Sequence, residues 1–215
     1  MLGAFLTPLF MYLRFTPNSI SWFGFILGIL SLSVILSEIS NYLKWGALIY
    51  LISVIIDYCD GTLARYNKNA NFYGRFIDGF IDVTNGSLFL IGISIYLINM
   101  YQFSSLSYFL ILFAIPSYII GTLITDRYSS FSRWISEENK LKVNPTIKFY
   151  LPTKLIIRMT DLKFLLLIGM IFEENFCFPY LILIIVYNII VILFHIFYAK
   201  KFFNIKASSH RINQK

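Results

Sequence analysis

The sequence predicts an all-α integral membrane protein in which six transmembrane helices follow a short N-terminal interfacial helix. Apolar residues make up 58% of the 215 residues, and the mean hydropathy is +0.71. A soluble domain cannot bury that much apolar surface. The apolar runs are long and continuous, whereas the strands of a membrane barrel alternate apolar and polar residues. This pattern favours helices over a barrel.

The N-terminal residues 1–15 predict a short helix that lies along the membrane interface. This segment is apolar and partly amphipathic, and it lacks the basic start of a secretory signal. Thr16, Pro17, Asn18 and Ser19 follow it. A polar cluster that contains a proline is typical of a helix start, so the first span is expected to begin here.

The predicted spans cover about residues 20–37, 42–57, 72–99, 107–125, 156–172 and 178–199. The first of them carries Gly24 and Gly28, a spacing that allows close packing between membrane helices of the same molecule. We expect residues 16–199 to form the bundle and residues 200–215 to form a basic cytoplasmic tail. The chain 1–215 is then a single membrane domain.

Charge placement predicts the orientation of the bundle. With six spans, every Lys and Arg except Lys44 falls on one side of the membrane. Cytoplasmic loops carry the excess of basic residues, so both termini and the site in residues 57–82 are expected to face the cytoplasm, at the cell inner membrane or its equivalent. The net charge of +7 fits this topology and contact with anionic lipid, and we expect no nucleic-acid partner.

Four carboxylates in residues 57–82 form the candidate site. Asp57 and Asp60 are three residues apart at the end of one apolar run, and Asp78 and Asp82 are four apart at the start of the next. Both intervals place the two side chains on one face of a helix. Two such pairs on antiparallel neighbours can converge into one pocket, where Mg²⁺ or Mn²⁺ would find oxygen ligands and separate like charges.

Small and basic residues accompany these carboxylates. Gly61 is expected to end the helix after Asp60 and to let the backbone approach a ligand closely. Arg65 offers a planar, permanently charged group that suits phosphate. Gly74 is expected to open the following helix beside Arg75.

The spacing of this stretch resembles the signature of the CDP-alcohol phosphotransferase family. Every fixed position of that signature is matched, by Asp57-x-x-Asp60-Gly61-x-x-Ala64-Arg65, eight further residues, and Gly74-x-x-x-Asp78-x-x-x-Asp82. The resemblance extends to Thr16-Pro17-Asn18 and to the number of apolar segments. It is weak across residues 127–160 and in the C-terminal tail.

The resemblance implies a metal-dependent enzyme of phospholipid biosynthesis that moves a substituted phosphate to an alcohol hydroxyl and releases CMP. The donor is CDP-linked, most commonly CDP-diacylglycerol. Asp57, Asp60 and Asp78 would be the main ligands of two Mg²⁺ or Mn²⁺ ions, to which Asp82 would also contribute. In the family the fourth aspartate is the base that takes the proton of the acceptor hydroxyl, and Asp82 occupies that position.

The resemblance also implies a binding site for the cytidine diphosphate portion of the donor. Gly61, Ala64 and Arg65 would bind this portion, and Asn18 and Gly74 would border it. Members of the family are often homodimers, which we also expect here.

The acceptor is not defined by these motifs. Arg127 and Arg158, in the basic segment between the fourth and fifth spans, are candidates for holding a phosphorylated acceptor. They also satisfy the bias of cytoplasmic loops toward basic residues, which is the interpretation we prefer for Arg133.

Two alternative functions are compatible with part of the pattern. One is the same chemistry with a soluble CDP-alcohol donor and a lipid acceptor. The other is a divalent-cation transporter whose carboxylates form the transport site. Arg65, between the two acidic pairs, argues against the transporter because a cation path gains nothing from a fixed positive charge.

Overall fold

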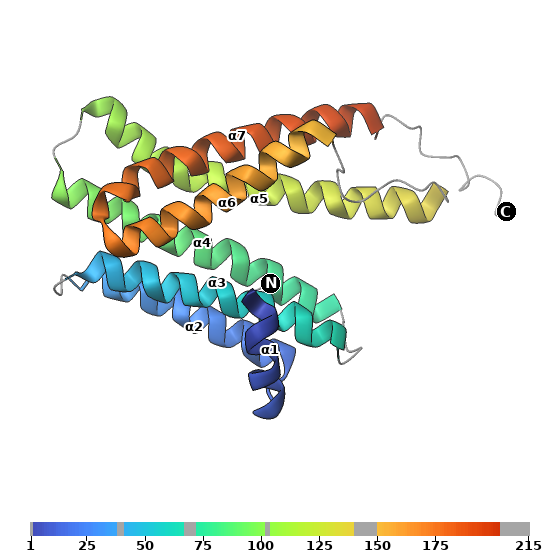
Figure 1. Ribbon diagram of the computed structural model, residues 1–215. Coiled ribbons are helices and arrows are strands. Elements are labelled where there is room, and N and C mark those ends of the chain that lie inside the picture. Colours follow the sequence, from blue (N-terminus) through green and yellow to red (C-terminus); the bar gives the residue numbers. More distant parts are fainter. Residues whose placement is uncertain (1, 38–40, 67–71, 102–103, 140–149, 203–215) are drawn as a thin grey trace.

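Seven α-helices and one short 3₁₀ helix make up the described part of the chain. The computed structural model describes residues 2–37, 41–66, 72–101, 104–139 and 150–202 (Figure 1). The elements are α1 (Leu2–Tyr12), α2 (Pro17–Ile35), α3 (Tyr42–Tyr66), α4 (Phe72–Met100), α5 (Ser105–Asn139), α6 (Tyr150–Phe172), η1 (Glu174–Phe176) and α7 (Cys177–Phe202). The all-α prediction is confirmed.

Five helices are long and apolar enough to cross a membrane, namely α2, α3, α4, α5 and α7. The protein is therefore an integral membrane protein, but the predicted count of six spans is not shown. Of the six predicted spans, the one that these five helices do not include is the fifth, which corresponds to α6. Every stretch of 18 residues in α6 includes Arg158, Asp161 and Lys163. Three charges within one crossing length lower its hydropathy and set this helix apart from the others.

The start of α2 follows the predicted signals. Thr16 occupies the N-cap position, and its hydroxyl oxygen accepts a hydrogen bond of 3.2 Å from the backbone N–H of Ser19. Pro17 is the first helical residue, where its missing N–H is not needed. These local preferences fix where α2 begins.

The predicted end of the helix after Asp60 is wrong. α3 continues through Gly61 to Tyr66. Cys59 and Leu63 are buried against α1 on the same face as Ile56, so packing of this face extends the helix past the glycine. The same holds for α5, which runs beyond the predicted end of the fourth span at residue 125 and buries Tyr128 and Ser132.

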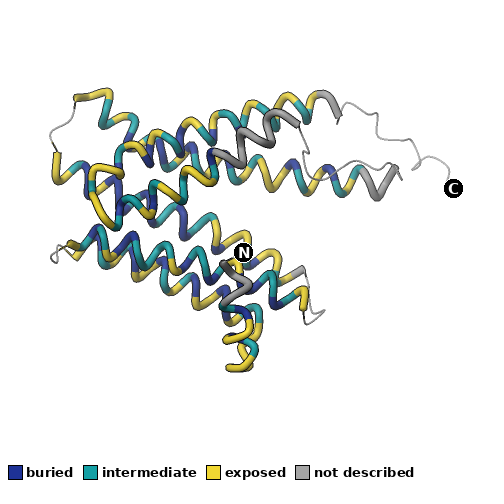
Figure 2. The backbone as a smooth tube through the Cα atoms, viewed as in Figure 1, coloured by how far each residue is buried: buried dark blue, intermediate teal, exposed yellow. Residues whose placement is uncertain are grey.

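The helices form two layers that meet along α4 and α3. α2, α3 and α4 pack together in one layer, with α1 lying against α3, and α5, α6 and α7 form the other layer (Figure 1). α4 contacts α5, and α3 contacts α6, which joins the layers. Buried residues line the inner faces of the helices, and exposed residues lie on the outside (Figure 2).

Large apolar side chains cover the outer faces of the candidate spans. Phe109, Leu123 and Leu193 are 61%, 54% and 62% exposed, respectively. A water-soluble protein would not present so many of these side chains to solvent, whereas lipid tails would cover them. This distribution agrees with a location in the membrane.

Small residues bring α2 close to α3 and α4, as the glycine spacing predicted. The Ser53 hydroxyl of α3 donates to the backbone oxygen of Gly24 (2.8 Å), and the Ser31 hydroxyl of α2 donates to that of Gly46 (2.8 Å). Gly28 lies directly against the side-chain amide of Asn85 on α4. Close approach of backbones is the usual means by which membrane helices gain packing energy.

We predict that Gly28→Ala destabilises the protein more than Gly24→Ala. A Cβ atom at Gly28 would overlap the buried Asn85 amide, whereas the nearest atom to a Cβ at Gly24 lies at an ordinary 3.8 Å. Overpacking of this kind costs about 1–3 kcal/mol. Thermal unfolding of the purified protein in detergent should show a clear drop in Tm for Gly28→Ala alone. Equal Tm values for the two variants would contradict the described packing.

Candidate active site

The carboxylates of α3 and α4 converge where the two helices meet. Asp57 and Asp60 lie near the C-terminal end of α3, and Asp78 lies in the second turn of α4. One carboxylate oxygen from each of these three residues lies within 4.8 Å of the others. The predicted convergence of the two acidic pairs is confirmed for these three side chains.

Asp82 lies beside this cluster. Its carboxyl group is within hydrogen-bond range of the Asp57 carboxyl, and it is one helical turn further along α4 than Asp78. Its side chain is exposed and lines an internal cavity, whereas Asp60 is buried. Asp57 also lines this cavity, but it is half-buried, so Asp82 is the more accessible of the two carboxylates that face the open space.

The donor set fits a divalent cation. Arg65 and Arg75 exert a favourable electrostatic effect on Asp60 and Asp78, but the four carboxylates outnumber these two cations, and Asp60 is only 5% exposed. Ionised carboxylates this close repel one another unless a cation or a proton lies between them. Oxygen-only ligands are those that Mg²⁺ and Mn²⁺ prefer. The cluster of Asp57, Asp60 and Asp78 can thus hold a metal ion.

Ser21 holds Asp60 in place. Its hydroxyl donates a hydrogen bond to the Asp60 carboxylate and lies 3.2 Å from the backbone oxygen of Pro17. Asn18 lies three residues before Ser21 in the same first turns of α2 and is half-buried. The cap that starts α2 therefore also places its N-terminal end against the cluster. Sequence reasoning identified Asn18 but missed Ser21.

A polar network one turn from the carboxylates fixes three helices together. The Asn85 side-chain amide nitrogen donates to the backbone oxygen of Gly24 (3.1 Å) and to the Ser53 hydroxyl (3.2 Å). Ser53 precedes Asp57 by four residues, and Asn85 follows Asp82 by three. The Asn85 nitrogen, the Ser53 hydroxyl and the Gly24 oxygen are bonded, whereas Asn85 Oδ1 is buried with no hydrogen-bond partner among the described residues. The bonded groups set the register of α3 against α4.

Tyr118 connects α5 to the site by a hydrogen bond. Its hydroxyl donates to the backbone oxygen of Asp82 at 3.1 Å. This approach depends on Gly86, since a Cβ atom at that position would overlap the Tyr118 hydroxyl. The second layer of helices is therefore anchored at Asp82 itself.

The residues predicted for nucleotide binding lie on the same helix ends. Gly61, Ala64 and Arg65 occupy the last two turns of α3, and Gly74 occupies the first turn of α4. Arg65 is exposed, and its guanidinium lies over Gly61, 3.4 Å from the Thr62 hydroxyl. The arrangement places an exposed cationic group beside the carboxylates.

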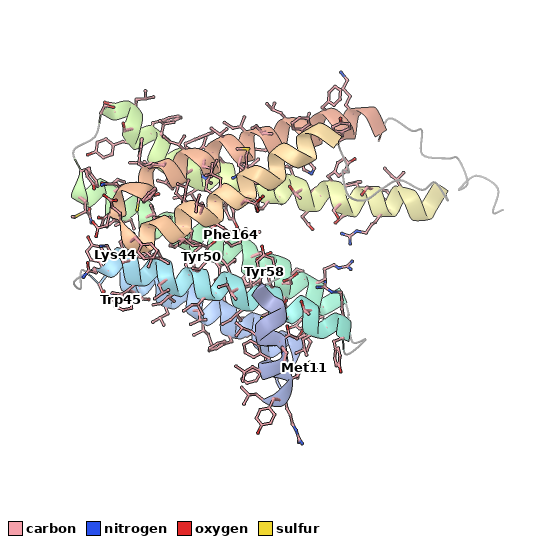
Figure 3. The ribbon with its side chains drawn as sticks, in the orientation of Figure 1. Met11, Lys44, Trp45, Tyr50, Tyr58 and Phe164 are labelled. Atoms are coloured by element: carbon pink, nitrogen blue, oxygen red, sulfur yellow. The ribbon has the colours of Figure 1, made fainter. Side chains whose placement is uncertain are left out.

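A cavity of about 300 Å³ opens between the two layers beside the carboxylates. Tyr50 and Tyr58 of α3 and Phe164 of α6 lie along the boundary between the layers (Figure 3). Side chains from five helices line the cavity, and the polar ones are Tyr50, Ser53, Asp57, Tyr58, Asp82, Asn85, Tyr118, Thr122, Thr160, Lys163, Tyr180, Tyr187 and Asn188. Much of this set is uncharged and capable of hydrogen bonding.

The two arginines predicted for the acceptor are not among the described residues that line this cavity. Arg127 is exposed on α5, and the side chain of Arg158 on α6 lies outside the described residues. The cation that the structure does place there is Lys163. The sequence analysis did not assign Lys163 to a site, although its spacing of three residues from Thr160 puts both on one face of α6.

Comparison with known proteins agrees with this geometry. A family model described as CDP-alcohol phosphatidyltransferase matches residues 14–172, from just before α2 to the end of α6. The matched region contains all four aspartates. No curated protein matches the chain.

Proposed function

Because the chain belongs to the CDP-alcohol phosphatidyltransferase family, we propose that it transfers the phosphatidyl group of CDP-diacylglycerol to an alcohol in phospholipid biosynthesis. Family membership makes the protein a membrane phosphotransferase that releases CMP, and the aspartate cluster fits the metal that such an enzyme needs. It also favours an enzyme over the cation transporter. The identity of the donor is the first part of the proposal.

The apolar surface at the level of the carboxylates supports a lipid-linked donor. Phe76 and Phe80 flank Asp78 on α4 and are 69% and 48% exposed, and Tyr58 next to Asp57 is 53% exposed. Lipid chains would cover such side chains. A donor whose diphosphate reaches the cluster could then keep its acyl chains against the same surface.

We assign the metal ligands as the sequence suggested. Asp57, Asp60 and Asp78 would be the main ligands of two Mg²⁺ or Mn²⁺ ions, and Asp82 would contribute an oxygen. Such ions supply charge neutralisation for the donor diphosphate and for the leaving CMP. Ser21 keeps the Asp60 carboxylate oriented through its hydrogen bond.

The ends of α3 and α4 would bind the cytidine diphosphate portion of the donor. Arg65 offers two parallel N–H donors to a phosphate. Gly61 has no side chain and Ala64 has only a methyl group, so the ligand can approach the surface of α3 at these turns. Asn18 and Gly74 would border this portion.

Asp82 would act as the base toward the acceptor. The acceptor oxygen forms a bond to the phosphorus that carries the diacylglycerol, and the bond from that phosphorus to the CMP oxygen breaks. CMP leaves with the electron pair, and the proton of the acceptor hydroxyl passes to the Asp82 carboxylate. Of the four aspartates, Asp82 is the one that is both exposed and part of the cavity wall, which supports this role.

The remaining parts of the proposal concern topology, assembly and the acceptor. We place both termini and the site on the cytoplasmic side, because basic residues gather there. The enzyme would act as a homodimer of single-domain chains, each comprising residues 1–215. Arg127 and Arg158 remain candidates for contacting an anionic acceptor.

The donor can be tested directly. With Mg²⁺ or Mn²⁺ and a mixture of small alcohols, the purified protein should release CMP from CDP-diacylglycerol and not from CDP-choline or a CDP-polyol offered with diacylglycerol. The reason is the lipid-facing surface around Asp78. CMP release from a soluble donor alone would contradict the proposed donor and support the alternative with a lipid acceptor.

The base assignment predicts the effect of one substitution. Asp82→Asn should lower the rate of CMP release by about 100-fold or more, because the amide cannot accept the proton of the acceptor hydroxyl. Binding of the CDP-linked donor, measured by its effect on Tm, should persist. Asp161→Asn on the exposed face of α6 serves as the matched control and should be fully active. Full activity of the Asp82 variant would rule out this role.

A further inference from the structure

A small hydrophobic cluster, separate from the larger core of the bundle, lies beside the carboxylates. Its buried members come from three helices and are Phe10 of α1, Ile20 of α2, and Ile56, Cys59 and Leu63 of α3. Cys59 immediately precedes Asp60 on α3. Ile20 immediately precedes Ser21, whose hydroxyl donates a hydrogen bond to Asp60. The cluster therefore contains the chain neighbours of both partners in that hydrogen bond.

α1 closes this cluster from outside the bundle. Thr7 and Phe10 lie one turn apart on α1, and both are buried against α3. The Thr7 side chain is a hydrogen-bond partner of the Cys59 thiol, and Phe10 packs among the apolar members of the cluster. Without α1, the face of α3 that carries Cys59 and Leu63 would be open. The packing that fixes the position of Asp60 would then loosen.

A defined turn joins α1 to the start of α2. The backbone N–H of Phe15 donates to the backbone oxygen of Phe10 at 3.0 Å, and that of Arg14 donates to Met11 at 3.0 Å. Arg14 has a φ of 57°, which completes the Schellman arrangement of a helix C-terminus. The Phe10 and Phe15 rings pack edge to face, and Thr16 then caps α2. α1 and the first turns of α2 are therefore held as one unit.

The opposite face of α1 is apolar and exposed. Tyr12 is 84% exposed, Leu9 and Leu13 are also exposed, and residues 2–13 contain no Lys, Arg, Asp or Glu. The axis of α1 is steeply inclined to that of α3 (Figure 1). A helix with this composition and inclination lies along the bilayer surface while α3 crosses the membrane. The occupant of this face is therefore the boundary between lipid headgroups and acyl chains, which also covers the exposed Trp22 on α2.

From these contacts we infer that α1 is a positioning element of the metal site, held on α3 by the bilayer that covers its outer face. The inner face of α1 keeps Asp60 where a metal ion needs it, without touching the metal or the substrates. The inference rests on the metal site of the proposed function. It adds the part of the chain, and the lipid surface, on which the affinity of that site for metal depends.

The rate at which N-ethylmaleimide labels Cys59 reports whether α1 lies on α3. Both cysteines are buried, and Cys177, which belongs to the larger core, is the internal reference when mass spectrometry assigns the label. In lipid nanodiscs, Leu9→Glu should increase the labelling rate of Cys59 alone by about tenfold or more, because a charge at the bilayer boundary detaches α1. Leu106→Glu is the matched control, an exposed apolar position at the start of α5, and should behave like the wild type.

Mn²⁺ binding then shows whether α1 acts on Asp60. In the absence of substrates, Leu9→Glu and Phe10→Ala should raise the Kd for Mn²⁺ by about tenfold or more, because the carboxylate loses its fixed orientation. Phe10→Leu keeps most of the apolar volume and should bind Mn²⁺ nearly as the wild type does. Leu106→Glu should leave the Kd unchanged.

Enzyme kinetics separate positioning from a loss of folded protein. In Leu9→Glu and Phe10→Ala, the Mn²⁺ concentration that gives half-maximal CMP release should rise with the Kd, and excess Mn²⁺ should restore kcat. A merely structural role of α1 would instead lower kcat at every Mn²⁺ concentration. Labelling of Cys177 identifies global unfolding. If Phe10→Ala shows it, Leu9→Glu decides the question, because it changes an exposed side chain.

Two results would overturn the inference. Protection of Cys59 in Leu9→Glu would show that the bilayer does not hold α1 on α3. Exposure of Cys59 with an unchanged Kd for Mn²⁺ would show that α1 does not position Asp60. If no CDP-linked donor yields CMP, the proposed function fails, while the labelling and Mn²⁺ measurements still decide the role of α1. A wild type that binds no Mn²⁺ would overturn the inference together with the metal site.

Discussion

The structure depends on holding like charges together at the ends of two helices. Oxygens of Asp57, Asp60 and Asp78 lie within 4.8 Å of one another, and Asp82 adjoins them. Such a group is unfavourable by itself in a largely apolar protein. A divalent cation would convert the repulsion into ligation, and the diphosphate of the proposed donor would supply the oxygens that the protein leaves open. The metal site and the diphosphate donor that we propose both follow from this one electrostatic constraint.

Packing around the cluster keeps these helix ends in register. Gly28 gives Asn85 the space to reach α2, and Asn85 in turn bonds to Gly24 and to Ser53. These contacts lie one turn away from Asp57 and Asp82, so a shift of α3 against α4 would break buried hydrogen bonds before it separated the carboxylates. The second layer is tied to the same point through Tyr118. The fold therefore supports the site from the inside of the bundle.

The sequence predicted those parts of the molecule that depend on local spacing. The intervals between the aspartates place each pair on one helix face, and Thr16 and Pro17 define the start of α2. Tertiary packing decided the parts that were missed or wrong. α3 continues through Gly61 because its buried face continues, and α6 combines apolar packing with four charged residues. The partners that Asn85 and Lys163 contact lie on other helices, so their roles appear only when the helices are assembled.

The most direct measurement of the central claim is the binding of Mn²⁺ to the purified protein, followed by electron paramagnetic resonance. The wild type is predicted to bind two Mn²⁺ ions per chain, close enough for their spins to couple. Asp60→Asn should lose the coupled signal, whereas Asp161→Asn on the exposed face of α6 should keep it. Weak binding of isolated Mn²⁺ ions that is the same in all three proteins would contradict a metal centre formed by α3 and α4.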